Sequence, residues 1–90
     1  SYVYANDQKI TVEKSTNQQN NIFNLSLDFV KDIDGSIIKN ITPCQGGIYN
    51  KKENYITWNL DCIPCDVSFD FAGINNIFSG TVYVKVKIIE

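Results

Sequence analysis

Three cysteines, Cys44, Cys62 and Cys65, are the residues of this 90-residue chain best suited to chemistry. A zinc site built on them would need a fourth ligand, and the chain contains no histidine to supply it. A redox site of the Cys-x-x-Cys type needs a helix in an alternating strand and helix fold, and no helical pattern accompanies residues 62–65. A structural disulfide is the favoured interpretation, because small secreted domains often need such a bond.

The pairing of these cysteines depends on a predicted hairpin over residues 47–60. Its register, counted outward along both arms, places Cys44 opposite Asp61 and beside Cys62 and Cys65, within the reach of a disulfide. We favour a Cys44–Cys62 bond, with Cys44–Cys65 second and a small Cys62–Cys65 ring as a further alternative. The third thiol is then either inert or available to cross-link a neighbouring subunit.

Residue types that usually carry catalysis or nucleic-acid binding are missing from the chain. It has no histidine, its eight basic residues are all lysines, and its formal net charge is −2. Nucleophilic catalysis therefore lacks its commonest base, and the charge gives no reason to expect nucleic acid as a partner. We expect neither enzymatic activity nor a cofactor.

Two other constellations have simpler structural explanations. Residues 31–35 carry acids that could bind calcium, but they lack the distal glutamate of a calcium loop and are better explained as a solvated turn. An isopeptide bond from Lys9 or Lys14 to Asn75 or Asn76 would need a buried lysine, whereas alternation places both lysines outside. No metal site is predicted.

Exposed aromatic rings give the best hypothesis for ligand binding. Tyr55 and Tyr83 both point away from the core by alternation, so they could form a platform for a sugar. Cross-strand packing between tyrosines on a sheet surface is the alternative, and we prefer it.

The elements that position these residues are organised around the hairpin at 47–60. A polar turn separates two arms rich in β-branched and aromatic residues, and the second arm alternates between apolar and polar side chains. Asn50 is predicted to pair with Tyr55 across the turn. Trp58, the only tryptophan, lies on the apolar face and is the predicted core anchor.

Further strands with one apolar and one polar face are predicted on both sides of the hairpin. Such strands form antiparallel sheets that pack face to face, and no helical period of useful length is present. We therefore expect one all-β domain over residues 1–90, an immunoglobulin-like antiparallel β-sandwich of seven to eight strands. Residues 1–5 form an arm that could add to a neighbour's open sheet edge. Besides the hairpin arms, the predicted strands span residues 1–5, 8–14, 22–30, 36–41, 66–72 and 81–89.

Four short segments share a pattern with a known family: Thr42-Pro43, Gly47-Ile48-Tyr49, Ile56-Thr57-Trp58-Asn59-Leu60 and Gly80-Thr81-Val82-Tyr83-Val84-Lys85-Val86. With them the chain resembles the bacterial surface-protein repeat called domain of unknown function eleven, in which Asn24–Phe29 would be the long second strand. The cysteines and the insertion from Cys62 to Ser79 depart from that pattern. The resemblance implies a spacer, adhesive or assembly module on a cell surface.

The sequence thus predicts a non-catalytic structural or adhesive module of an extracellular or cell-surface protein, stapled by a disulfide. It would be a spacer, an adhesin domain or a fibre subunit that contacts other domains or subunits through sheet edges or a disulfide. The alternative is a carbohydrate- or ligand-binding module attached to a larger secreted protein. Because Ser1 is not preceded by Met and no signal peptide follows, we expect an excised domain or a processed chain. No segment is apolar enough for membrane insertion.

Overall fold

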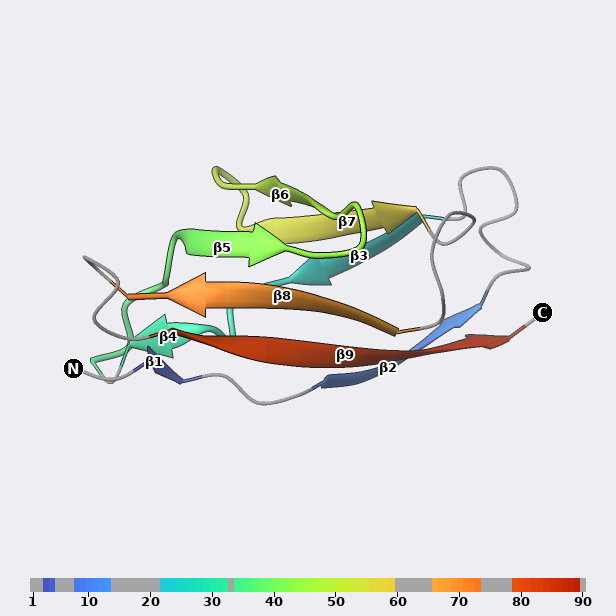
Figure 1. Cartoon of the computed structure of the whole chain (residues 1–90), viewed down its shortest axis with the longest axis horizontal. Helices are drawn as coiled ribbons and strands as arrows, with labels where there is room; N and C mark the ends of the chain where they lie inside the picture. Colours follow the sequence, from blue (N-terminus) through green and yellow to red (C-terminus); the bar gives the residue numbers. More distant parts are fainter. Residues whose placement is uncertain are drawn as a thin grey trace.

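Strands are the only regular elements that the computed structural model describes (Figure 1). It describes residues 3–4, 8–13, 22–32, 34–59, 66–73 and 79–89. The strands are β1 (Val3–Tyr4), β2 (Gln8–Glu13), β3 (Ile22–Ser26), β4 (Lys31–Asp32), β5 (Asn40–Pro43), β6 (Ile48–Asn50), β7 (Tyr55–Asn59), β8 (Asp66–Ala72) and β9 (Ser79–Ile89).

These strands form two main sheets that pack face to face. One has the order β2–β9–β8–β5 and the other the order β3–β7–β6, while β1 and β4 form a separate short pair. All pairings are antiparallel except that of β2 with β9, which is parallel. Apart from β2, the sheets have the strand order of an immunoglobulin sandwich. The predicted fold class is confirmed, with the two-residue β4 as an additional strand.

Alternation along the strands fills the space between the sheets. Ile56 and Trp58 of β7, Phe69 of β8 and Val84 of β9 are fully buried. Phe23 of β3 stacks against Trp58, with the ring centroids 5.8 Å apart. Burial of each large apolar side chain contributes about 1.5–3 kcal/mol, so this layer supplies most of the stability.

The hairpin formed by β6 and β7 has the predicted register. Asn50 pairs with Tyr55, and Ile48 pairs with Thr57. The turn closes at Asn54, which has a φ of 59° and donates its backbone N–H to the Asn50 carbonyl at 2.8 Å. Asparagine tolerates this left-handed conformation better than most residues do.

The strand predicted over residues 22–30 ends early, at Ser26. The Leu27 N–H donates to the Asn54 carbonyl at 2.9 Å, and the Val30 N–H then donates to the Leu27 carbonyl at 2.9 Å. The chain therefore turns at Asp28 and Phe29. The period-two pattern continues past the true end of the strand, because the hairpin turn, which is remote in sequence, decides where β3 stops.

The strand predicted over residues 36–41 begins late, at Asn40. The chain reverses tightly at Gly35, whose φ is 89°. Ile37 consequently faces Lys31 in an isolated bridge instead of joining a main sheet. Only after this reversal does the chain reach β8 and pair with it as β5.

The N-terminal arm is paired within its own chain. Val3 lies opposite Asp32 and Tyr4 lies opposite Lys31, in the antiparallel pair of β1 and β4. Addition of residues 1–5 to a neighbouring molecule would have to displace this pairing, so exchange of the arm stays a prediction.

Candidate functional site

The loop Cys44–Gly47 carries the chain from one sheet to the other, between β5 and β6. Gln45 and Gly46 both have positive φ values, 51° and 73°. The Gly47 N–H donates to the Cys44 carbonyl at 3.1 Å, which closes the turn. This reversal directs β6 into the three-stranded sheet.

Trp58 holds this loop from the core side. Its Nε1–H donates to the Cys44 carbonyl oxygen at 2.7 Å, and the residue is fully buried. A Cβ on Gly47 would lie 2.5 Å from Trp58 Nε1 and 2.7 Å from the Pro43 Cβ, so only glycine permits this approach. The tryptophan that the sequence predicts as core anchor thus also fixes the cysteine loop.

The other side of the loop is bonded to β8. The Cys44 N–H donates to the Ser68 carbonyl at 2.9 Å. Gln45 Oε1 accepts hydrogen bonds from the Ser68 N–H at 3.0 Å and from the Ser68 hydroxyl at 3.3 Å. Alternation predicts an exposed Ser68, but the residue is only 7% exposed because it lies beneath this side chain.

The register argument for the cysteines needs correction. It assumed that the first hairpin arm continues without interruption back to Cys44, whereas the turn at Gln45 and Gly46 interrupts it. Cys44 is bonded to Ser68 of β8 instead. Among the described residues the Cys44 thiol, which is half-buried, has no disulfide partner. Cys62 and Cys65 lie outside the described residues, so the pairing stays a prediction.

The two tyrosines proposed as a ligand platform lie on different sheets. Tyr55 is half-buried on β7, and Tyr83 is 62% exposed on β9. The inner faces of both sheets meet in the core, so the outer faces that carry these rings point in opposite directions. Tyr55 and Tyr83 therefore cannot form one platform, and the hypothesis that joined them is corrected.

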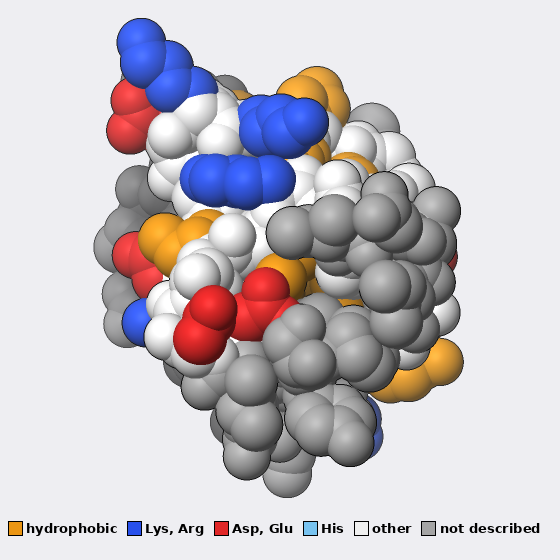
Figure 2. Space-filling model, turned by 90° about the vertical axis from the view of Figure 1, so that its left-hand side faces the viewer, with side chains coloured by type: hydrophobic (Ala, Val, Ile, Leu, Met, Phe, Trp, Pro, Cys, Tyr) orange, Lys and Arg blue, Asp and Glu red, His pale blue; other side chains and the backbone are white. Residues whose placement is uncertain are grey.

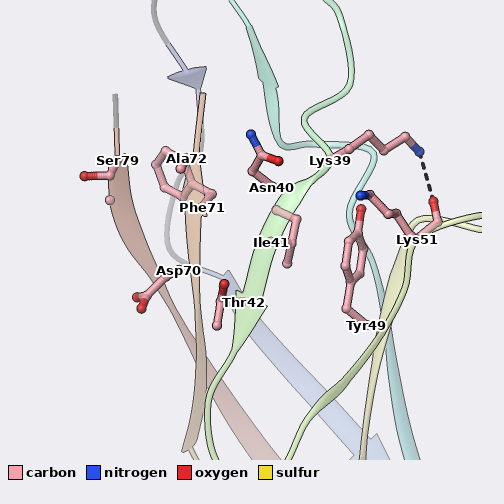
Figure 3. Close-up of a pocket in the computed structure, with 11 residues that line it drawn as sticks. Lys39, Asn40, Ile41, Thr42, Tyr49, Lys51, Asp70, Phe71, Ala72 and Ser79 are labelled. Atoms are coloured by element: carbon pink, nitrogen blue, oxygen red, sulfur yellow. Dashed lines mark hydrogen bonds between the residues drawn. The ribbon is translucent and has the colours of Figure 1, made fainter. Parts of the chain in front are cut away.

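A groove of about 530 Å³ crosses β5 at the edge of the four-stranded sheet (Figure 3). It is lined by polar side chains from β5 and its approach, from the hairpin, and from β8 and β9, together with the apolar Ile41, Phe71 and Ala72. No sequence pattern indicated this groove, because segments far apart in the chain meet there only through the fold. The side chains used below are Lys39, Asn40, Thr42, Tyr49, Lys51 and Asp70.

Two polar side chains of the groove are held by their own partners. The Tyr49 hydroxyl donates to Asn54 Oδ1 at 2.9 Å. Burial raises the pKa of the Tyr49 phenol above its usual value, so the group remains a neutral donor at physiological pH. The Thr81 hydroxyl donates to Asp70 Oδ1 at 2.6 Å, which fixes that carboxylate on the outer face of the sheet.

The possible calcium segment is a turn. Asp34 Oδ1 accepts the Ser36 N–H at 3.0 Å, and this hydrogen bond lowers the pKa of the Asp34 carboxyl. Within the described part of the chain, no group of three or more His, Cys, Asp or Glu side chains could hold a metal ion. The residues considered for an isopeptide bond are Lys14, Asn75 and Asn76 together with the side chain of Lys9, and these lie outside the described residues.

The fold defines the class of protein: an immunoglobulin-like β-sandwich module. The chain matches the family "Internalin J, Immunoglobulin-like domain" over residues 8–86, and it belongs to that family. This supports the predicted immunoglobulin-like bacterial surface domain, but it does not support the specific resemblance to domain of unknown function eleven.

One solved structure shows how the chain relates to a larger protein. It is described as the functional domain of InlJ from Listeria monocytogenes, which includes a cysteine ladder. The two chains are 31% identical and superpose with a TM-score of 0.62 over 91% of this chain. This chain covers 18% of that structure. No curated protein matches significantly.

No helix among the described residues is long and apolar enough to cross a membrane.

Proposed function

We propose that this chain is a non-catalytic spacer module of an extracellular or cell-surface bacterial protein, which carries adhesive parts of that protein away from their anchor. Membership of the internalin J immunoglobulin-like family supports this role. So does the coverage of 18% of the related structure, because a module of this size is one part of a longer assembly.

The observation that carries the proposal is the position of the first and last strands. The molecule measures 42 × 22 × 19 Å, and β1 lies at one end of the long axis while the last residues of β9 lie at the other (Figure 1). Modules of this kind can follow one another head to tail. A pulling force on such a chain would first meet the short β1–β4 pair, then act on β2, and leave through β9.

The parallel pairing of β2 with β9 resists such a force. Gln8 lies opposite Val84, and the pairing continues to Glu13 opposite Ile89. Tension pulls β2 toward the N-terminal end and β9 toward the C-terminal end, so the strands must slide past each other. Parallel ladders have evenly spaced hydrogen bonds, and sliding loads all of them together instead of one after another.

Single-molecule force spectroscopy on tandem copies tests this role. Proline in the middle of β2, placed at whichever of Thr11 and Val12 directs its N–H toward β9, should lower the unfolding force clearly, because it removes a backbone donor from the ladder. Ile56→Val is the matched control, since it destabilises the buried core by about 0.5–1.5 kcal/mol without touching this ladder. Equal losses of force in both variants, at equal losses of stability, would contradict the proposal.

The disulfide belongs to the same proposal. Cys44 is fixed by bonds from its backbone to Ser68 and Trp58, so a bond to its thiol would tie a rigid point of the sandwich to the connection before β8. Cys65 precedes Ser68 by three residues, which span at most about 11 Å. Because Cys44 is bonded to Ser68, both Cys65 and Cys62 stay candidates for its disulfide partner.

A further inference from the structure

We infer that the groove across β5 binds a short saccharide that carries carboxylate groups. Its volume of about 530 Å³ lies within the usual range for small-molecule sites. The inference goes beyond the spacer role and does not depend on it, since neither the groove nor its side chains take part in the β2–β9 ladder.

Two lysines supply positive charge on one side of the groove. Lys39 precedes β5 and Lys51 follows β6, and both side chains are exposed. Lys39 Nζ donates to the backbone carbonyl of Lys51 at 3.3 Å, so the ammonium group is held against the hairpin turn (Figure 3). Lysine side chains lie side by side on this end of the molecule (Figure 2). Two adjacent cations favour an anion placed between them.

Hydrogen-bonding groups and an aromatic ring make up the rest of the site. Thr42 lies opposite Asp70 in the register of β5 and β8, and both are exposed on the outer face of the sheet. Asn40 is held by a bond from its Nδ2 to the Gly73 carbonyl at 3.2 Å. Figure 3 shows the Tyr49 ring on the far side of β5 from Asp70. Amide, hydroxyl and carboxylate groups along β5 and β8, with an aromatic ring across β5 from the carboxylate, suit a ligand that spans β5 and carries many hydroxyl groups.

A peptide strand is a poorer occupant of this groove than a saccharide. In an antiparallel pair, every second residue directs its backbone N–H and C=O toward the partner strand. The Cys44 N–H bonds to the Ser68 carbonyl of β8, so the backbone groups of Thr42 and Asn40 also point toward β8. Ile41 and Pro43 therefore present their backbones to the open edge. Pro43, the last residue of β5, has no N–H, so a strand added along this edge would lose a hydrogen bond at that end of β5.

The test uses nuclear magnetic resonance titration of the intact chain with a trisaccharide of galacturonic acid. Its methyl ester is the matched neutral probe, and a short poly-glutamate peptide is the matched acidic probe without sugar. Shifts from the trisaccharide should concentrate at residues 39–42, 49–51 and 70. The Lys39→Gln, Lys51→Gln double variant should weaken binding about tenfold, whereas Lys85→Gln on the exposed face of β9 should leave it unchanged.

Each contrary outcome overturns a stated part of the inference. Equal binding of the methyl ester would exclude a role for the carboxylates, and equal binding of poly-glutamate at the same residues would exclude saccharide recognition. Absence of shifts with about 10 mM trisaccharide would exclude the site. Both variants replace exposed side chains, and well-dispersed spectra would show that they fold. None of these outcomes alters the force experiment, so the two proposals fail separately.

Discussion

The carbonyl oxygen of Cys44 is the point where the core, the loop and the cysteine chemistry meet. It accepts the Trp58 Nε1–H at 2.7 Å and the Gly47 N–H at 3.1 Å. A buried indole N–H needs an acceptor, so Trp58 is better placed here than a purely apolar side chain would be. One residue thereby fills the core and also fixes a surface loop.

Substitution of the two adjacent glycines should separate close packing from backbone conformation. Gly47→Ala should destabilise the domain by about 1–3 kcal/mol and shift the Trp58 emission, because the new Cβ collides with the indole. Gly46→Ala should cost about 1–2 kcal/mol from its φ of 73° but leave the emission unchanged, because no atom lies within 4 Å of the added Cβ. Urea unfolding and tryptophan fluorescence measure both effects. An unchanged emission in Gly47→Ala would contradict the packing argument.

Sequence reasoning reached part of this arrangement. Alternation in 55–60 placed Trp58 on the inner face, and the structure buries it there. The acceptor of its N–H could not be foreseen, because the acceptor is a backbone carbonyl positioned by a turn with positive φ at Gln45. Glutamine gives no strong local signal for that conformation.

Among the elements, the hairpin turn acts as a junction for three segments. The Asn54 carbonyl accepts the Leu27 N–H one step beyond the last β3–β7 pair, and β3 ends there because its partner strand begins only at Tyr55. The Asn54 side chain accepts the Tyr49 hydroxyl at 2.9 Å and donates to Asp28 Oδ1 at 3.3 Å. Because Asn54 is only 3% exposed, loss of these bonds would leave buried polar groups without partners.

Two substitutions at Asn54 should give different losses of stability. Asn54→Gly keeps the left-handed backbone and loses only the side-chain hydrogen bonds, at a cost of about 1–3 kcal/mol. Asn54→Ala loses the same bonds and should cost about 1–2 kcal/mol more, because alanine is strained at a φ of 59°. Equilibrium unfolding in urea measures the difference. Equal stability of the two variants would show that the conformation of the turn contributes nothing.

At this scale the sequence predicts pairing within the hairpin better than it predicts where other strands end. Asn50 opposite Tyr55 follows from a short polar turn between two clear arms. The ends of β3 and β5 depend on contacts with Asn54 and on the reversal at Gly35, which apolar periodicity does not contain. The burial of Ser68 also depends on a contact that periodicity does not contain, because the Gln45 side chain reaches Ser68 from the loop between β5 and β6.

For the molecule as a whole, the proposed disulfide should contribute substantially to stability. A bond from Cys44 to Cys62 or Cys65 closes a loop and lowers the conformational entropy of the unfolded chain. The folded domain is thereby stabilised by about 3 kcal/mol. Protein made under oxidising conditions should therefore lose about this much stability when reduced. Peptide mapping of Cys62→Ser and Cys65→Ser identifies the partner. Complete alkylation of all three cysteines in the folded, unreduced protein would contradict the staple.

The sandwich itself was predictable, whereas its strand order was not. Eight of the nine described strands, all but β4, fall on segments with alternating or β-prone residues, which is sufficient to predict two layers around one core. Alternation does not tell which strand pairs with β2. The pattern shows which side chains of a strand point to the core, but it does not identify the neighbouring strand. The parallel match of β2 with β9 therefore emerges only from the assembled fold.

The pairing of β2, near the start of the chain, with β9, the last strand, also determines when folding can finish during synthesis. A ribosome or secretion channel releases the chain from its N-terminus, so β2 waits without a partner until residues 84–89 have emerged. Contacts so distant in sequence form slowly, and chains that stop short leave the exposed edge of a sheet open to aggregation. Completion of the module is thus a late, single event that coincides with the release of its last strand.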